Sequence, residues 1–173
     1  MWTKSKLDKK VTVRWNALGR LGEKLAKLNL QRVGFTRIRN LNEENLNNCF
    51  ADIYAVKDKQ AYIISVKARN KFENNGNLNS RYKLGKDCYP HAELAEAKHK
   101  AKAAWIAIAI DVKTLTYDAY FGLLSELGNS TGISMSSKAT SEYVELAIQA
   151  NLIADSGLTR KDCMNLENTY ERK

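Results

Sequence analysis

The stretch that decides the fold is FADIYAVKDKQAYIISVKAR, residues 50–69. Side chains alternate in character over residues 50–56, and a mostly apolar run follows over residues 61–69. The polar residues 57–60 separate the two runs, a pattern typical of antiparallel strands joined by a short turn. Residues 50–69 are therefore predicted to form a β-hairpin.

A helix is predicted ahead of this hairpin, over residues 16–33. Leucines recur there at steps of three and four residues, which places them on one helical face: Leu18, Leu21, Leu25 and Leu28. Asn16 is a suitable N-cap and Gly34 a suitable C-terminal stop. Between helix and hairpin, we expect a short strand at residues 35–39 and a polar loop at residues 40–48.

Beyond the hairpin, residues 70–88 are rich in Asn and Gly and are expected to form a long exposed loop. A second helix is predicted to begin near Pro90 and to end at Ala104. Its inward stripe is predicted to consist of Leu94, Ala97, Ala101 and Ala104. Two strands, a Gly/Ser-rich connection and a third helix are predicted to follow at residues 105–111, 116–122, 128–137 and 137–155.

The predicted element order, α-β-β-β-α-β-β-α, is typical of an α/β sandwich with helices flanking a mixed central sheet. The 173 residues are predicted to form a single domain, with a core at about 16–122 and a helical C-terminal extension at 123–173. No apolar run is long enough for a bilayer span, and residues 1–10 are polar, so a cytoplasmic protein without a membrane partner is expected.

The three cysteines, Cys49, Cys88 and Cys163, are widely separated and form no CxxC motif. This pattern indicates neither a disulfide framework nor a zinc site, and it favours a reducing compartment.

Positive charge is concentrated near the N-terminus. Residues 1–39 contain eleven Lys or Arg and two acids, which equals the formal charge of +9 for the whole chain. A regional excess of this kind favours a polyanionic partner such as nucleic acid. The alternative is a solvated basic surface without a partner.

One acid and one lysine are predicted to converge on the hairpin. Side chains alternate along a strand, so Ser65 and Lys67 share a face, and Asp52 lies on the neighbouring strand. A carboxylate that holds Mg²⁺ beside a lysine that steadies the attacking water or the developing charge can hydrolyse a phosphodiester.

Three short motifs resemble those of a known family. They are Gly-Glu-x-x-Ala from Gly22, Ala-Asp-Ile-Tyr from Ala51 and Ile-Ile-Ser-Val-Lys-Ala-Arg from Ile63, and together they resemble the PD-(D/E)xK nuclease superfamily over about residues 16–122. The resemblance implies a restriction-endonuclease-like fold. It also implies that Glu23 is the helix glutamate near the metal, that Asp52 is the metal-binding aspartate and that Lys67 is the catalytic lysine.

The sequence departs from that motif at two positions. Ala51 replaces a proline that varies within the superfamily, whereas Ser65 replaces the second acid and contributes no charge to a metal. Some restriction enzymes of the superfamily take the missing glutamate from the following helix, where the candidates here are Glu93 and Glu96. Measured from the predicted inward stripe, Glu93 is the better candidate, so we expect Asp52 and Glu93 to bind Mg²⁺, for which Mn²⁺ can substitute.

Basic side chains of the first helix, the hairpin and the loop are predicted to hold the substrate, with Phe72 and Tyr82 available to stack on bases. The predicted nucleic-acid-binding residues are Arg20, Lys24, Arg69, Lys71, Arg81, Lys83 and Lys86. A mobile solvated loop is the alternative interpretation of residues 70–88.

The leading hypothesis is thus a Mg²⁺-dependent endonuclease that acts on DNA, of the restriction, resolvase or repair type. Two alternatives stay open: a catalytically decayed module that only binds nucleic acid, and an RNA-cutting toxin domain. A homodimer would suit the cutting of two strands, although the sequence identifies no dimer surface.

Overall fold

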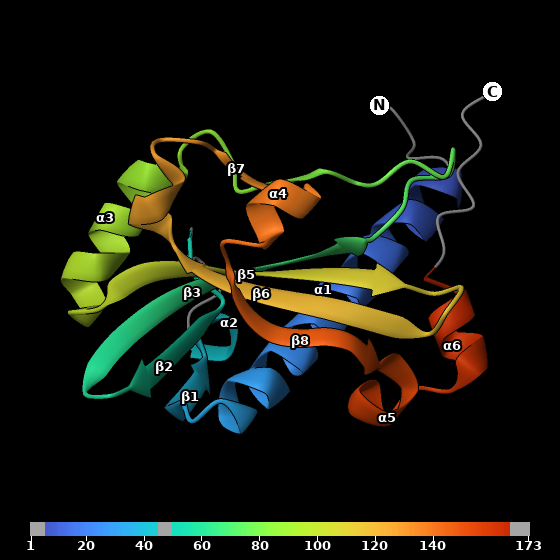
Figure 1. The fold of residues 1–173 in the computed structure, drawn as a ribbon. Coiled ribbons are helices and arrows are strands. Elements are labelled where there is room, and N and C mark those ends of the chain that lie inside the picture. Colours follow the sequence, from blue (N-terminus) through green and yellow to red (C-terminus); the bar gives the residue numbers. More distant parts are fainter. Residues whose placement is uncertain (1–5, 45–49, 167–173) are drawn as a thin grey trace.

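A six-stranded mixed sheet forms the centre of the molecule, with helices on both sides (Figure 1). The computed structural model describes residues 6–44 and 50–166, and of residues 6–16 and 44 it describes the backbone alone. The strand order is β1-β2-β3-β5-β6-β8. The prediction of an α/β fold with a mixed, helix-flanked sheet is confirmed. Cys49, one of the three cysteines, lies outside the described residues.

The predicted hairpin is confirmed. Strands β2 (Ile53–Lys57) and β3 (Gln60–Asn70) pair antiparallel, from Ile53 opposite Ile64 to Lys57 opposite Gln60. Asp58 and Lys59 at the turn have φ of 51° and 66°. A two-residue turn with positive φ at both positions matches the twist of the strands it joins.

The remaining strands extend the sheet on both sides of this hairpin. β1 (Thr36–Asn40) pairs antiparallel with β2, and β5 (Lys102–Asp111) pairs parallel with β3 over nine residue pairs, from Tyr62 opposite Lys102 to Asn70 opposite Ile110. β6 (Thr116–Leu123) lies antiparallel to β5. Parallel neighbours need a crossover, and here it contains helix α3 (Cys88–His99).

Helix α1 (Lys6–Arg32) covers one face of the sheet and begins about ten residues earlier than predicted, so Asn16 lies inside it and is not its N-cap. Leu18, Leu21 and Leu25 are buried against the sheet. Gly22 permits the close approach, because a Cβ there would lie 2.5 Å from the Cβ of Ala68 on β3. This contact brings the next residue, Glu23, to the sheet.

The opposite face is covered by α3 and by a small sheet of β4 (Arg81–Lys83) and β7 (Gly132–Ser134), with the short helices η1 (Leu124–Leu127) and α4 (Ser137–Thr140) beside them. The expected loop at residues 70–88 is therefore wrong in part. Tyr82 is 1% exposed and packs with Trp105, because β4 needs an apolar anchor on the main sheet.

The second helix is shorter and rotated relative to the prediction. α3 ends at His99, Lys100 has a φ of 50°, and β5 begins at Lys102. Leu94, predicted to face inward, is 72% exposed, whereas Cys88 and Ala92 are buried. The predicted stripe was wrong because Ala101 and Ala104, which helped to define it, lie beyond the helix.

The predicted helix at residues 137–155 is also wrong. α4 ends at Thr140, and β8 (Val144–Asn151) then joins the edge of the main sheet antiparallel to β6. The chain ends its described part in α5 (Leu152–Ser156) and α6 (Arg160–Met164), which bury Leu152 and Cys163 in the core under α1. The C-terminal region is thus part of the sheet rather than a helical extension of it.

The expected polar loop after β1 contains one further short helix, α2 (Leu41–Glu44). Among the described residues, none of the helices has the length and apolar character that crossing a bilayer would require.

Candidate metal and nucleic-acid site

Two acids and one amide meet where α1, α2 and the start of β2 come together. The Asn42 side-chain Nδ2 donates to Glu23 Oε1 at 3.1 Å and to Asp52 Oδ1 at 3.0 Å. Asn40 Nδ2 donates to the other oxygen of Glu23, Oε2, also at 3.1 Å. The Asn42 amide therefore bridges the carboxylates of Glu23 and Asp52. We call these two residues the carboxylate pair.

Backbone hydrogen bonds fix Asp52 beside β3. Its N–H donates to the carbonyl of Ile64 at 2.9 Å, and its Oδ2 accepts from the Val66 N–H at 2.7 Å. Its own carbonyl accepts from the Leu41 N–H at 2.9 Å, which ties α2 to the same point. Asp52 is thus held on two sides, with Oδ1 directed to Asn42.

The environment of Glu23 shifts its pKa. Partial burial raises the pKa of Glu23, and the negative charge of Asp52 raises it further, whereas the hydrogen bonds from Asn40 and Asn42 and the positive charge of Lys27 act in the opposite direction. Burial and a nearby like charge both disfavour the ionised form. A cation between the two acids would relieve both effects.

Ser65 and Lys67 share one face of β3, because side chains alternate along a strand. Asp52 lies directly before β2, where its Oδ2 accepts from the N–H of Val66, the residue between them. Ser65 is 2% exposed, whereas Lys67 is half-buried. Burial raises the pKa of the Cys88 thiol, and the positive charge of Lys67 acts in the opposite direction, which places Lys67 near the start of α3.

The structure does not join Glu93 to the carboxylate pair. Glu93 is exposed on α3, and Glu96 Oε1 accepts from the Ala103 N–H at 2.8 Å. Over residues 6–44 and 50–166, no group of three or more His, Cys, Asp or Glu side chains is arranged to hold a metal ion. The preference for Glu93 over Glu96 followed from the inward stripe, which the exposure of Leu94 contradicts.

The carboxylate pair nevertheless suits Mg²⁺. This ion prefers oxygen ligands and usually binds proteins through one or two carboxylates, keeping waters or taking substrate phosphates at its other positions. Glu23 and Asp52 provide two such carboxylates. The donor set therefore fits a hard divalent cation without a third acid.

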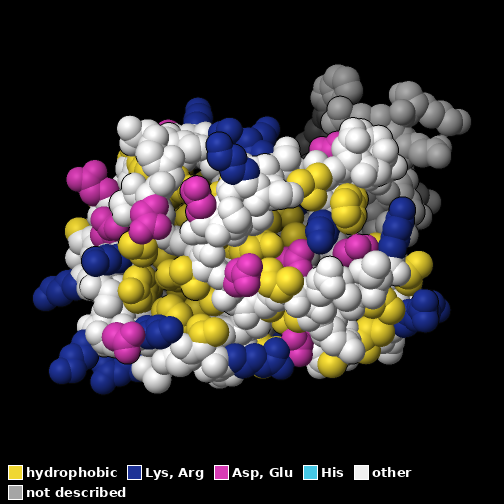
Figure 2. Space-filling view, viewed as in Figure 1, with side chains coloured by type: hydrophobic (Ala, Val, Ile, Leu, Met, Phe, Trp, Pro, Cys, Tyr) yellow, Lys and Arg dark blue, Asp and Glu magenta, His cyan; other side chains and the backbone are white. Residues whose placement is uncertain are grey.

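Three of the predicted nucleic-acid-binding residues donate within the protein. Lys24 Nζ donates to the Ser156 carbonyl, Arg69 Nη1 donates to the Ala68 carbonyl at 2.7 Å, and Lys71 Nζ pairs with Asp118 Oδ2 at 3.0 Å. All of the predicted set except Lys71 are exposed, namely Arg20, Lys24, Arg69, Arg81, Lys83 and Lys86. Figure 2 shows Lys and Arg side chains over β7 and α4 and around the tip of the β2–β3 hairpin.

Tyr82 cannot stack on a base in this structure. Its ring is buried under β4, and burial raises the pKa of its hydroxyl. Phe72 is 42% exposed and lies beside Leu78 through an antiparallel bridge.

The sequence did not reveal Asn40 and Asn42 as members of the site. They lie in an Asn-rich stretch that is typical of a polar loop. Their role depends on α2, which begins where the Asn40 side chain accepts from the Asn42 N–H at 2.9 Å. No spacing motif in the sequence connects them to Glu23 or Asp52.

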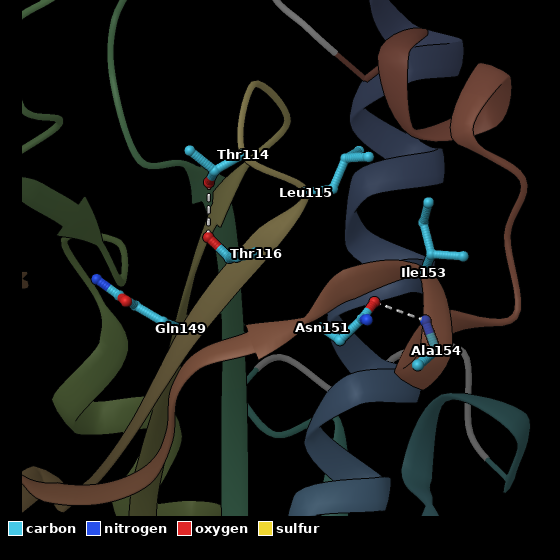
Figure 3. Close-up of a pocket in the computed structure, with 7 residues that line it drawn as sticks. All are labelled: Thr114, Leu115, Thr116, Gln149, Asn151, Ile153 and Ala154. Carbon is cyan, nitrogen blue, oxygen red and sulfur yellow. Dashed lines mark hydrogen bonds between the residues drawn. The ribbon is translucent and has the colours of Figure 1, made fainter.

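A separate pocket of about 490 Å³ lies between the turn that joins β5 to β6, the end of β8 and α5 (Figure 3). Its lining is uncharged and comprises Thr114, Leu115, Thr116, Gln149, Asn151, Ile153 and Ala154. No residue of the carboxylate pair or of its amide bridge lines it.

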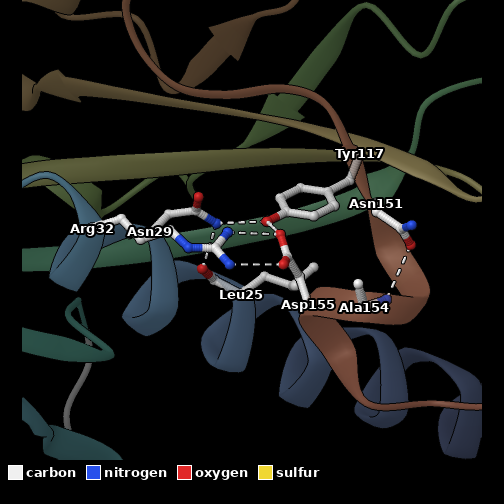
Figure 4. Close-up of polar contacts among 7 residues, drawn as sticks. All are labelled: Leu25, Asn29, Arg32, Tyr117, Asn151, Ala154 and Asp155. Atoms are coloured by element: carbon white, nitrogen blue, oxygen red, sulfur yellow. Dashed lines mark hydrogen bonds and ion pairs between the residues drawn. The ribbon is translucent and has the colours of Figure 1, made fainter.

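A second acid site lies further along α1 (Figure 4). Arg32 donates through both terminal nitrogens to Asp155, at 2.9 Å each, and the Tyr117 hydroxyl donates to the same carboxylate. Asn29 Nδ2 donates to the Tyr117 hydroxyl at 2.8 Å. These four residues, the Asp155 clamp, connect α1, β6 and α5.

Comparisons with family models, with curated proteins and with solved structures found no match.

Proposed function

We propose that this protein is a Mg²⁺-dependent endonuclease that hydrolyses DNA phosphodiester bonds. The observation that carries the proposal is the carboxylate pair, Glu23 and Asp52, bridged by one amide at the start of β2 and bonded to Val66 of β3, the strand that carries Ser65 and Lys67. Two carboxylates bridged by an amide, beside a strand that carries a lysine, match the requirements of metal-assisted phosphodiester hydrolysis.

The sheet supports the finer assignment to the PD-(D/E)xK superfamily. A long helix packs on an antiparallel β1-β2-β3 meander, and β5 follows parallel to β3 after a crossover helix. This arrangement agrees with the helix, four-strand and second-helix core that the motif resemblance implies. The proposal is a restriction-endonuclease-like fold with Ser65 at the position of the second acid.

Each residue has a defined task in this proposal. Asp52 and Glu23 hold the cation, and Asn42 keeps their oxygens a fixed distance apart. When bound, Mg²⁺ would supply positive charge at the phosphate and lower the pKa of a bound water. Lys67 supplies a positive charge that steadies the attacking water or the negative charge that develops on the phosphate.

Cleavage of supercoiled plasmid with Mg²⁺, Mn²⁺ or EDTA tests the proposal. Asp52→Asn and Lys67→Ala should each lower the rate by about 10²–10³-fold, the usual cost of removing one stabilising group from such a site. Asp58→Asn and Lys102→Ala are matched controls, because both residues are exposed and lie at strand ends. Full activity of Lys67→Ala would overturn the proposed mechanism.

The decayed-module alternative predicts salt-sensitive binding with no cleavage under any metal. Ser65→Glu separates it from the active enzyme: a gain of cleavage favours decay, whereas loss or no change favours a site that functions with serine. RNA offered beside the plasmid tests the toxin alternative, which predicts that RNA is cut and DNA is spared.

A further inference from the structure

The small β4–β7 sheet, the ribbon, has a buried face and a basic face. Its pairing extends beyond the strands, since the Met135 N–H donates to the Ser80 carbonyl at 2.7 Å and the Leu84 N–H to the Thr131 carbonyl at 2.8 Å. Tyr82, Ile133 and Met135 point inward and pack with Trp105. Arg81 and Lys83, at alternate positions of β4, are exposed on the outside.

Arg81 is held in place by a glycine on the partner strand. A Cβ built on Gly132 would lie 2.5 Å from Arg81 Nε and 3.0 Å from its Cγ and Cζ. The arginine side chain therefore crosses the ribbon in space that only glycine leaves open. Its contact with the partner strand restricts the conformations of the side chain before any ligand arrives, which lowers the entropy lost on binding.

The positive charge on the outer face of the ribbon is not neutralised by an acid among the described residues. Register pairs Arg81 with Ser134 and Lys83 with Gly132, so the outer face carries two cations, a hydroxyl and no acid. Among the described residues, neither Arg81 nor Lys83 forms an ion pair, in contrast to Lys71 with its partner Asp118. The donors of Arg81 are thus free to face solvent.

The ribbon lies on the face of the sheet that carries Lys67. Its inner face packs on Ala107 and Ala109 of β5, which lie opposite Lys67 and Arg69 of β3 in register. Residues 84–87 connect β4 to α3, and the positive charge of Lys67 lowers the pKa of Cys88, the first residue of α3, against the effect of burial. In Figure 1, the ribbon and α3 cover the same side of the sheet.

We infer that the ribbon is a duplex-DNA-binding element, in which Arg81, lying across Gly132, donates to the DNA and Lys83 adds a second cationic contact. A two-stranded ribbon fits the major groove of B-form DNA, whereas the major groove of A-form RNA is too narrow for side chains to read. The inference rests on the proposed function in that its ligand is the substrate of the nuclease.

Fluorescence anisotropy with a labelled DNA duplex in EDTA tests the inference without cleavage. Arg81→Ala should weaken binding by at least about fivefold. Gly132→Ala and Arg81→Lys, which keep the charge but displace or replace the guanidinium, should weaken it to a similar extent. The Arg81→Ala, Gly132→Ala double variant should bind no worse than either single variant, because both changes remove the same contact.

Two further variants test the contribution of Lys83 and the specificity of the effect for the ribbon. Lys83→Ala should weaken binding less and should reduce the slope of log affinity against log salt by about one. Arg160→Ala is the matched control, because Arg160 is exposed at the start of α6, and it should bind DNA as the unchanged protein does. Thermal unfolding of each variant separates lost contacts from lost folding.

Unchanged DNA affinity of Arg81→Ala would overturn the inference, and so would full affinity of both charge-preserving variants. An equal loss on a duplex RNA of the same sequence would overturn the assignment to DNA. The nuclease proposal can fail separately: the expected binding pattern without any cleavage supports the ribbon alone, whereas cleavage with an unaffected Arg81→Ala variant supports the nuclease alone.

Discussion

Helix α1 carries two hydrogen-bonded acid sites, and they differ in what faces the carboxylate. In the Asp155 clamp, a guanidinium and a phenol donate to one acid, and the hydrogen bond from Arg32 is the main cause that lowers the pKa of Asp155. In the carboxylate pair, Glu23 faces a second acid and receives only amide donors, and its pKa is raised.

This difference separates a structural site from a candidate functional one. In the Asp155 clamp, Arg32 neutralises the charge of Asp155, and the contacts join α1, β6 and α5. The carboxylate pair places two negative charges together with no Lys or Arg in hydrogen-bond contact among the described residues. Folding gains little from such a pair, whereas a divalent cation would gain two ligands from it.

The largest expected difference between the two sites is their response to Mg²⁺. At about 100 times its dissociation constant, Mg²⁺ should raise the free energy of unfolding by about 2.7 kcal/mol at pH 8. The gain should be smaller at pH 5, because the raised pKa of Glu23 lets protons compete with the cation there. Calorimetry with and without Mg²⁺ at both pH values measures this difference.

Asp52→Asn should abolish the Mg²⁺ response, and Asp58→Asn, at the exposed hairpin turn, should retain it. A response of equal size in Asp52→Asn would place the cation elsewhere on the protein.

A smaller effect is expected at the clamp. Tyr117→Phe removes the hydroxyl that bridges Asn29 and Asp155 and should lower the free energy of unfolding by about 1 kcal/mol. Urea titration at neutral pH checks this value. The Mg²⁺ response should be unchanged, since the hydroxyl touches neither Glu23 nor Asp52, and a lost response would mean that the two sites are coupled.

The clamp also predicts a pH dependence of the opposite sign to that of Glu23. The lowered pKa of Asp155 contributes stability above its ordinary value of 3.8, and this contribution is lost as pH falls through the lowered pKa. The stability difference between the unchanged protein and Arg32→Ala should therefore shrink in acid. A difference that stays constant down to low pH would contradict this account of the clamp.

The smallest effect is expected for Glu23→Gln in the absence of metal. An acid with a raised pKa destabilises the fold once ionised, so stability should fall as pH rises from 4.5 through the raised pKa. The variant should lack this fall and should be more stable at pH 8 by about 0.5 kcal/mol. Glu43→Gln, at an exposed position of α2, is the control, and a loss of stability in Glu23→Gln alone would contradict the charge argument.

The sequence predicted those elements whose pattern is local. The β2–β3 hairpin was predictable because Asp58 and Lys59 sit between two runs of strand character, and the helix through Leu18, Leu21 and Leu25 because its period is regular. β8 was missed because its residues, VELAIQAN, include good helix formers. Pairing with β6 overrides that propensity, and pairing is not visible in one segment alone.

The candidate site was predictable only in part for the same reason. Glu23, Ser65 and Lys67 lie in regular elements and Asp52 directly precedes β2, so the alternation and the motif spacing identified them as candidates. The rotation of α3 depends on where the helix ends, and the positive φ of Lys100 ends it before Ala101. Asn42 belongs to the site through tertiary contacts that connect α2 to α1 and to Asp52, and no local pattern encodes them.

The most direct test of the central claim is the anomalous difference density of crystals soaked in Mn²⁺. The account predicts a peak between the carboxylates of Glu23 and Asp52, within coordination distance of an oxygen from each. A well-ordered crystal with an anomalous peak elsewhere, or with none at this pair at saturating Mn²⁺, would contradict it.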